Sequence, residues 1–139
     1  MLGGVRIEHS LGLAGHSDAD AVLHAITDAV LGALAAGDIG EMFPDSDPRW
    51  KDADSRQFLH AAVALAAQRG LHVVNCDVTV LAEQPRLSPH KQAMRASIAE
   101  LLGVAAADVA VKAKTNERMG FVGRQEGLAA MAVVLLSDE

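Results

Sequence analysis

The stretch VVNCDVTVL, residues 73–81, alternates between apolar and polar side chains over most of its length. Successive side chains of a β-strand point to opposite faces of its sheet, so this pattern predicts a strand with one buried face. The predicted apolar face holds Val74, Cys76, Val78 and Val80, and the opposite face holds Asn75, Asp77 and Thr79. We therefore expect this strand to belong to a sheet that helices cover on one side.

Segments with helical patterns lie on both sides of this strand, and a glycine follows each of them. Glycine is favoured just after a helix because it adopts a positive φ without steric cost. The predicted helices are residues 19–36 followed by Gly37, residues 55–69 followed by Gly70, and residues 88–102 followed by Gly103. These three helices are the expected cover of the sheet.

Three more segments predict strands, at residues 2–8, 109–114 and 128–136. The last is continuously apolar, which is typical of a buried strand. The resulting order is strand, helix, helix, strand, helix, strand, strand. This order predicts an α/β fold, an α+β sandwich whose mixed sheet carries helices on one face. The other face of the sheet would meet water or a partner subunit.

The composition suits one domain that spans residues 1–139. A net charge of −6, the absence of Tyr and the lack of a basic cluster argue against nucleic-acid binding. Cys76 is the single cysteine, so no intramolecular disulfide can form. The longest near-apolar stretch, residues 127–136, is too short to span a bilayer, and residues 1–10 lack a secretory signal. We expect a cytoplasmic protein that can still bind a small anionic ligand.

The segment GHSDADAVLHAITDAV, residues 15–30, gathers polar side chains at the start of the first predicted helix. Ser17 and Asp20 fit a capping box, in which both side chains accept free N–H groups of the first turn. His16 and Ser17 precede the helix, where its N-terminal N–H groups favour a phosphate. An exposed loop histidine is the simpler interpretation of His16 from these residues alone.

Asp20, His24, Thr27 and Asp28 form a narrow polar stripe along a helix that is otherwise apolar. A helix that is apolar nearly all round is buried, so the stripe must face a partner, a cavity or a metal. His24 and Asp28 are four residues apart and can touch, which would leave one ring nitrogen for a metal. A core histidine with an acidic partner is the alternative, because zinc needs three or four ligands.

Two loops rich in Gly, Pro and Asp follow this helix. In GDIG, residues 37–40, Asp38 lies between two glycines, which permit a close approach of the backbone to a ligand. In FPDSDPRW, residues 43–50, Asp45 and Asp47 lie beside prolines. These loops predict either contacts to substrate hydroxyls or ordinary solvated turns.

Two further loops, AEQPRLSPH (residues 82–90) and KAKTNERMGFVGRQEG (residues 112–127), contain the ends of predicted strands or follow them. Ligands of α/β folds bind at the carboxyl ends of strands. The polar side chains of interest are Arg86, Ser88, Lys114, Thr115, Glu117 and Arg124. Lys and Thr would hold phosphate oxygens and Glu117 would bind Mg²⁺ on a diphosphate, whereas a solvated surface side chain is the simpler interpretation of Arg86.

Together these segments resemble the 2-C-methyl-D-erythritol 2,4-cyclodiphosphate synthase family of the non-mevalonate isoprenoid pathway. The matching pieces, in the family's order and spacing, are AGHSDADAVLHAITDAVLGA, GDIGEMFPDSDP, QPRLSPH and KAKTNERMGFVGRQEG. The resemblance implies a lyase that converts 4-diphosphocytidyl-2-C-methyl-D-erythritol 2-phosphate to the cyclic diphosphate and CMP. It also implies a homotrimer with active sites between subunits, zinc, and Mg²⁺ or Mn²⁺.

The resemblance further implies roles for individual residues. His24 is the expected zinc ligand, Glu117 the expected Mg²⁺ ligand, and His16 and Thr115 the expected stabilisers of the transition state. The expected methylerythritol phosphate pocket comprises Asp38, Ile39, Gly40, Phe43, Pro44, Asp45, Ser46 and Asp47. The expected cytidine diphosphate pocket comprises Ala82, Glu83, Gln84, Pro85, Arg86, Leu87, Ser88, Lys114 and Thr115. Other expected substrate contacts are His16, Ser17, Asn116, Glu117, Phe121 and Arg124, the last two near a trimer-axis cavity that can hold an anion or isoprenoid diphosphate.

The sequence departs from the family at the expected zinc site. The family takes an Asp and a His from an Asp-x-His motif in a strand before GGVRI, and this sequence contains no Asp-x-His. We expect the sequence to be a fragment of an ordinary enzyme. The alternative is a genuine short chain that binds zinc poorly and serves as a trimeric nucleotide-binding module or inactive partner. Lys114 stands where Thr is frequent in the family, and Arg86 where Lys is common.

Overall fold

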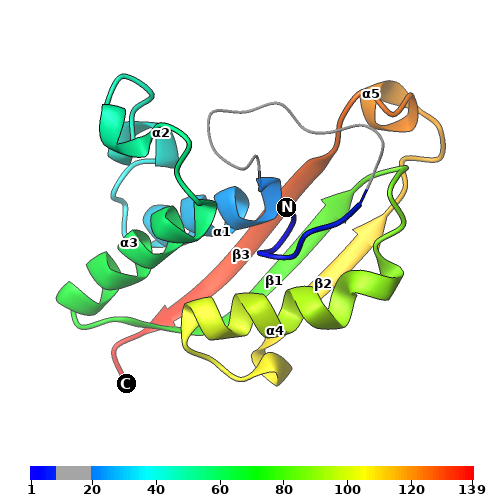
Figure 1. The fold of residues 1–139 in the computed structure, drawn as a ribbon. Coiled ribbons are helices and arrows are strands. Elements are labelled where there is room, and N and C mark those ends of the chain that lie inside the picture. The colour runs from blue at the N-terminus through cyan, green and yellow to red at the C-terminus, as the bar shows by residue number, and fades with distance from the viewer. Residues whose placement is uncertain (9–19) are drawn as a thin grey trace.

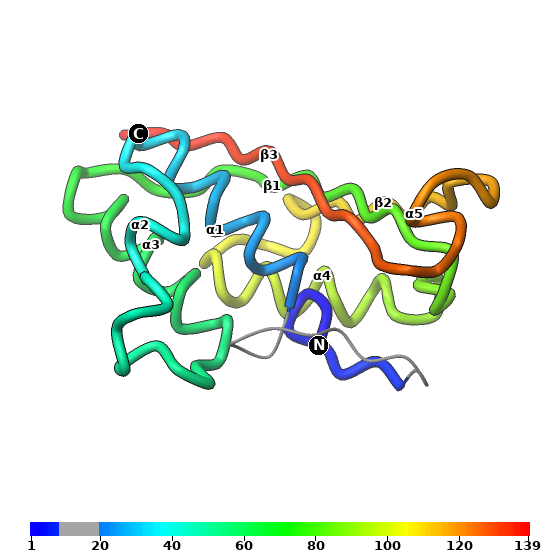
Figure 2. The backbone as a smooth tube through the Cα atoms, turned by 90° about the horizontal axis from the view of Figure 1, so that it is seen from above, coloured from blue at the N-terminus to red at the C-terminus, as the bar shows by residue number. Residues whose placement is uncertain are grey.

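The computed structural model describes residues 1–8 and 20–139. Within them, three strands form a mixed sheet in the order β2-β1-β3, with β1 parallel to β2 and antiparallel to β3 (Figure 1). Helices α1, α3 and α4 lie together on one face of this sheet, as the view from above shows (Figure 2). The α/β sandwich with helices on one face is therefore confirmed. The bounds are α1 Ala21–Ala33, α2 Ile39–Met42, α3 Ser55–Gln68, β1 His72–Leu81, α4 Lys91–Leu102, β2 Val109–Lys114, α5 Gly120–Gly123 and β3 Ala129–Ser137.

Strand β1 confirms the strand predicted over residues 73–81, with one error in its buried face. The alternation placed Val74 on that face, whereas Val73 is the buried residue and Val74 is half-buried. The pairing of β1 with β3 shifts between Val73 and Asn75, so Val74 is an extra residue in the ladder. An irregularity of this kind moves the preceding side chains to the other face, which alternation alone does not reveal.

Residues 2–8 do not form the predicted strand. Leu2 and Val5 make an isolated antiparallel bridge, and the Gly3 and Gly4 that join them have φ of 58° and 77°. A positive φ at both central residues is typical of a tight type I′ turn, for which Gly-Gly is well suited. The two glycines therefore reverse the chain at once instead of extending it.

Helix α1 is shorter than the helix predicted over residues 19–36, and it does not end at Gly37. Ala35 takes the left-handed conformation, with φ of 52°. The next N–H, that of Ala36, donates to the Leu31 carbonyl at 2.9 Å. These are the features of a Schellman motif, so α1 ends at a left-handed alanine two residues before Gly37.

The other two predicted helices are present with small changes at their ends. The helix predicted over residues 55–69 is α3, and Gly70 follows its last turn with φ of 75°. The helix predicted over residues 88–102 opens with a 3₁₀ turn, Ser88–His90, before α4 begins. Gly103 ends α4 in the left-handed conformation, as its position after the helix predicted.

Strand β3 is not the buried strand that its apolar run predicted. Its inner side chains pack against the core between the sheet and the helices, and α1 lies along it. Its outer side chains Met131, Val133 and Leu135 are 56%, 70% and 54% exposed. Because alternate side chains of a strand share a face, these three form one apolar row, which we call the β3 row. The outer face of the sheet thus carries a patch of the kind that marks an interface.

Candidate active site

The predicted site residues that the structure describes form two groups, one around α2 and one around α5, and these two elements lie at opposite ends of the molecule (Figures 1 and 2). The α2 group consists of His24 on α1 and of residues 38–47, in and around α2. The α5 group consists of residues 82–88, which follow β1, and residues 114–124, which follow β2 and include α5. Within the described residues, a single chain therefore keeps the predicted site residues in two separate groups.

His24 of the α2 group joins helix α1 to the start of α3. Its ring is half-buried, and Nε2 lies 2.8 Å from the Oγ of the fully buried Ser55. The ring centroid also lies 5.9 Å from that of Phe58. Sequence reasoning paired His24 with Asp28 and missed Ser55, because a contact across 31 residues leaves no local pattern. Asp28 Oδ1 accepts the N–H of Ile39 at 2.8 Å and so ties α1 to α2.

Asp20 and Thr27, the other two residues of the polar stripe, are fully buried and have partners within the fold. Asp20 Oδ1 accepts the N–H groups of Gly3 and Leu23, each at 2.9 Å, and Oδ2 accepts that of Gly4 at 2.8 Å. Thr27 Oγ1 donates to the Leu23 carbonyl at 2.8 Å. Asp20 is thus the N-cap of α1, which begins at Ala21, two residues after the predicted start at residue 19.

His16 and Ser17 lie outside the described residues. Their predicted roles in holding phosphate and stabilising the transition state stay predictions. The capping box predicted for Ser17 and Asp20 also stays a prediction, because Ser17 lies outside the described residues.

The loop around α2 is anchored by one aromatic cluster. Asp38 Oδ1 accepts the N–H of Glu41 at 2.9 Å and caps α2. Phe43 is buried, with ring centroids 4.9 Å from Trp50 and 4.8 Å from Phe58. The predicted pocket residue Phe43 therefore fixes where the loop starts, while the neighbouring Ile39 and Pro44 are half-buried and Gly40 is exposed.

The turn after Phe43 is held by an ion pair. Arg49 Nη2 donates to Asp47 Oδ2 at 2.7 Å, and the Arg49 N–H donates to Asp47 Oδ1 at 3.0 Å. The hydrogen bond from the guanidinium lowers the pKa of Asp47, and the same bond raises the pKa of Arg49. Asp45 and Ser46 lie exposed before this pair. The loop thus offers one carboxylate committed to Arg49 and two exposed polar side chains.

In the α5 group, the loops that follow β1 and β2 lie side by side, as expected for neighbouring parallel strands. The N–H of Ala82 donates to the Lys114 carbonyl at 2.9 Å. Glu83 Oε1 accepts the N–H of Asn116 at 3.0 Å and that of Arg118 at 2.8 Å. The structure therefore brings together the two segments that sequence reasoning assigned to one cytidine diphosphate pocket.

The second of these loops presents charged and hydroxyl side chains at the surface. Lys114, Thr115, Glu117 and Arg118 are all exposed. Glu117 and Arg118 have φ of 51° and 65°, and the Glu117 N–H points at Thr115 Oγ1 from 3.4 Å. Two cations and a hydroxyl beside one carboxylate can bind a phosphate group.

Some other side chains of the α5 group form contacts within the chain, and the rest range from buried to exposed. Arg124 Nε donates to Glu126 Oε1 at 2.8 Å, a hydrogen bond that raises the pKa of Arg124 and lowers that of Glu126. Phe121 is exposed. In the loop after β1, Leu87 is buried and Pro85 half-buried, whereas Gln84, Arg86 and Ser88 are exposed.

The described residues do not fit a complete metal site. No group of three or more His, Cys, Asp or Glu side chains among residues 1–8 and 20–139 is placed to hold a metal ion. His24 brings one imidazole, which lies against Ser55, whereas zinc takes three or four ligands. Glu117 brings one exposed carboxylate. Zinc at His24 and Mg²⁺ at Glu117 therefore stay predictions.

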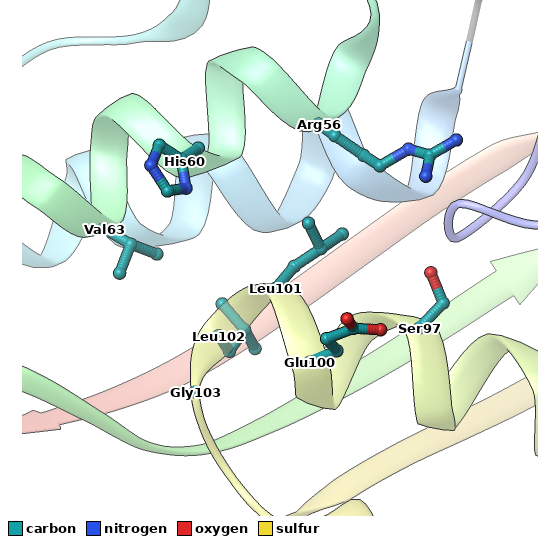
Figure 3. Close-up of a pocket in the computed structure, with 8 residues that line it drawn as sticks. All are labelled: Arg56, His60, Val63, Ser97, Glu100, Leu101, Leu102 and Gly103. Carbon is teal, nitrogen blue, oxygen red and sulfur yellow. The ribbon is translucent and has the colours of Figure 1, made fainter.

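A cavity of about 410 Å³ lies between α3 and α4 (Figure 3). Arg56 and His60 line it from α3, and Ser97 and Glu100 line it from α4. It contains no residue of the α2 or α5 groups. The predicted site is therefore separate from this cavity.

No helix in the described part of the chain is long and apolar enough to cross a membrane.

The model of the YgbB family matches residues 1–137, and the chain belongs to this family. It is similar to the 2-C-methyl-D-erythritol 2,4-cyclodiphosphate synthase of Dechloromonas aromatica (strain RCB), with 60% identity over 98% of this chain and 85% of the relative. The synthase of Pseudomonas aeruginosa (strain UCBPP-PA14) is 58% identical over 97% of this chain and 86% of its own length. The resemblance found from the motifs is therefore confirmed.

Solved structures of related proteins share the fold. A 2C-methyl-D-erythritol-2,4-cyclodiphosphate synthase has a TM-score of 0.92 and 39% identity, covering 99% of this chain and 89% of its own. A CDP-bound form of such a synthase has a TM-score of 0.87 and 36% identity, with the same coverage. The bifunctional IspDF of Campylobacter jejuni has a TM-score of 0.93 and 43% identity over 98% of this chain, which spans 37% of that longer protein.

Proposed function

We propose that this chain is a single-domain 2-C-methyl-D-erythritol 2,4-cyclodiphosphate synthase of the non-mevalonate isoprenoid pathway, acting in the cytoplasm. It converts 4-diphosphocytidyl-2-C-methyl-D-erythritol 2-phosphate to the cyclic diphosphate and releases CMP, which makes it a phosphorus–oxygen lyase. The observation that carries this proposal is the 60% identity to a curated synthase over 98% of the chain. The paired loops of the α5 group and the CDP-bound relative support it.

The reaction exchanges one phosphorus–oxygen bond for another. An oxygen of the 2-phosphate attacks the β-phosphorus of the diphosphate and closes the ring. The bond from that phosphorus to the bridging oxygen breaks, and CMP leaves with this oxygen. Phosphoryl transfer of this kind depends on positioning and charge stabilisation more than on covalent help from the protein. We assign that stabilisation to Thr115 and His16, with Lys114 beside Thr115 as a fixed positive charge.

We infer that the complete site forms between copies of the chain in a homotrimer. The α2 group would supply the methylerythritol phosphate pocket from one subunit, and the α5 group the cytidine diphosphate pocket from its neighbour. The separation of the two groups within one chain supports this arrangement (Figure 1). The exposed β3 row supports it as well, since large apolar patches on a surface mark protein interfaces.

Zinc at His24 and Mg²⁺ or Mn²⁺ at Glu117 complete the proposal. The described residues fit neither ion as a full ligand set, so the reaction steps above use side chains alone. A chelator experiment addresses the metals directly. Dialysis against EDTA is expected to abolish CMP release, and restored divalent ions are expected to recover it. Metal-independent CMP release would contradict the metal assignments and leave the proposed reaction standing.

The proposed reaction is tested by adding the substrate and following CMP and the cyclic diphosphate by ³¹P NMR. Equal amounts of both products are expected. Thr115→Ala is expected to lower kcat by roughly a hundredfold, because it removes a donor to the developing charge. Ser137→Ala, at the far end of β3, is the matched control and is expected to leave kcat unchanged. Binding of CDP without any CMP release would contradict the proposal and favour a trimeric nucleotide-binding module.

A further inference from the structure

We propose that Glu83 is a positioning residue that holds residues 115–119 in the shape that receives the substrate's diphosphate, an inference that rests on the proposed function. Glu83 is half-buried and lies just after β1. Its Oε1 accepts the N–H of Asn116 at 3.0 Å and the N–H of Arg118 at 2.8 Å. One carboxylate oxygen therefore joins the loop after β1 to the loop after β2.

The backbone that Glu83 holds has an unfavourable conformation. Glu117 and Arg118 are successive residues with φ of 51° and 65°. The left-handed region crowds the Cβ of any residue other than glycine, so two such residues in a row need support from their surroundings. The two N–H groups bonded to Glu83 belong to Arg118 and to Asn116, directly before Glu117. Glu83 thus supplies this support at the point where it is needed.

A second set of contacts holds the same turn from the side of α5. A Cβ on Gly123 would overlap the backbone of Arg118, so glycine is required for α5 to pack this closely. Asn116 Nδ2 also donates to the Met119 carbonyl at 2.7 Å. The turn is therefore fixed between Glu83 and α5, as expected for a preorganised binding loop.

These contacts determine which groups can reach a phosphate. The N–H groups of Asn116 and Arg118 are used by Glu83 and so are not donors to a phosphate, whereas the side chains of Lys114, Thr115 and Arg118 are exposed and can donate to one. A carboxylate turned toward a diphosphate would repel it. With Oε1 held by two N–H groups, Glu83 shapes the site through the loop and is not itself a ligand of the phosphate.

The test compares Glu83→Ala with Glu83→Gln for CDP binding by calorimetry and for amide hydrogen exchange. Glu83→Ala removes the acceptor and is expected to weaken CDP binding roughly tenfold or more, because both N–H groups lose their partner. It is also expected to speed exchange at Asn116 and Arg118. Glu83→Gln keeps an oxygen acceptor and is expected to retain both the affinity and the protection of the wild type.

The control is Glu100→Ala, which removes an exposed carboxylate on α4 and is expected to change neither measurement. Gly123→Ala disturbs the same turn from α5 and is expected to weaken CDP binding as Glu83→Ala does, with little further loss in the double variant. Wild-type affinity in Glu83→Ala, or equal losses in Glu83→Ala and Glu83→Gln, would overturn the inference. A wild type that binds no CDP would contradict the proposed function, and unchanged exchange in Glu83→Ala would then overturn the inference independently.

Discussion

Asp20 shows how far a residue's partners can lie from its local pattern. Its carboxylate has no exposed surface and accepts the N–H groups of Gly3, Gly4 and Leu23. The sequence places Asp20 at a helix start, which is correct, but the stripe it shares with His24 was predicted to face a partner, a cavity or a metal. Two of its partners come from a turn 16 and 17 residues earlier in the chain, and no periodicity records such a contact.

Asp20→Ala is expected to destabilise the protein strongly. The change leaves three N–H groups without this acceptor, and a buried donor that loses its partner costs about 1–3 kcal/mol. The free energy of unfolding is therefore expected to fall by roughly 3 kcal/mol or more in urea denaturation followed by circular dichroism. Asp138→Ala, at an exposed position, is the control and should stay within about 0.5 kcal/mol of wild type. A fall below about 1 kcal/mol in Asp20→Ala would contradict the assignment.

Cys76 is a second residue whose environment determines its chemistry. Its side chain is 2% exposed, and burial, helped by the charge of Asp77, raises the pKa of its thiol to about 12. The thiolate is the reactive form of cysteine, so native Cys76 is expected to react with iodoacetamide at pH 8 about a hundredfold or more slowly than the urea-unfolded chain. Similar rates in the two states would contradict this prediction.

The same shift fixes the sign of a pH dependence. The unfolded thiol ionises near its ordinary pKa of 9.0, below the pKa of the folded thiol, so the folded state holds its proton more tightly. The stabilising contribution of Cys76 is full below pH 9 and is lost as the pH rises toward 12. In urea titrations from pH 8 to 10, the wild type is expected to lose stability relative to Cys76→Ala. A constant difference between the two proteins would count against the shift.

At the scale of elements, the sequence predicts what depends on local patterns and misses what depends on packing. Alternation locates β1 and β2, and a glycine marks the true end of α3. The end of α1 was misplaced because Gly37 is the better left-handed residue, yet Ala35 takes that conformation. Ending the helix there leaves Leu34 buried in the core, a gain that no local rule contains.

In the candidate site, too, the sequence predicts some features, while others depend on packing. The segments after β1 and β2 could be predicted to meet, because the carboxyl ends of neighbouring parallel strands share one edge of the sheet. Which side chains turn outward depends on the register, in which Leu81 pairs with Lys114. This register places Glu83 beside the backbone of residues 116–118, where it accepts two N–H groups that no local sequence pattern predicts.

Ala35→Gly is expected to stabilise the end of α1. Ala35 has φ of 52°, where its Cβ is crowded and glycine is not. Allowing for the greater freedom that glycine gives the unfolded chain, the free energy of unfolding is expected to rise by about 0.5–1 kcal/mol. Ala96→Gly makes the same change at an exposed position within α4 and should lower it by about 1 kcal/mol. Equal effects of the two variants in thermal unfolding would contradict the left-handed assignment.

At the scale of the whole molecule, the two faces of the sheet differ in their side chains and their surroundings. The inner face packs against the helices and forms the core. On the outer face, β1 and β2 present polar side chains such as Asp77 and Lys112, which form an ion pair at 3.0 Å, while β3 presents the apolar β3 row. The apolar run that predicted a buried strand thus agrees with burial in an assembly rather than in the chain alone. The separation of the α2 group from the α5 group is consistent with the homotrimer proposed above.

Val133→Lys is expected to break the proposed homotrimer while leaving the chain folded. Val133 is the most exposed residue of the β3 row, and it lies opposite Asp77 in the strand pairing. A lysine there meets an opposite charge within the chain, which favours the folded strand, but it places a charge in the centre of the proposed apolar interface. Light scattering after gel filtration is expected to give three times the 14.5 kDa chain mass for wild type and a single chain mass for the variant.

The matched control is Ala93→Lys, which adds the same charge at an exposed position on α4, on the opposite side of the sheet. It should remain trimeric, because that helix layer takes no part in the proposed interface. Circular dichroism should be unchanged in both variants, so that a lower mass reports assembly and not unfolding. If Val133→Lys keeps the wild-type mass, the β3 row is not the interface. The proposed homotrimer would then need another interface to bring the α2 group of one copy to the α5 group of the next.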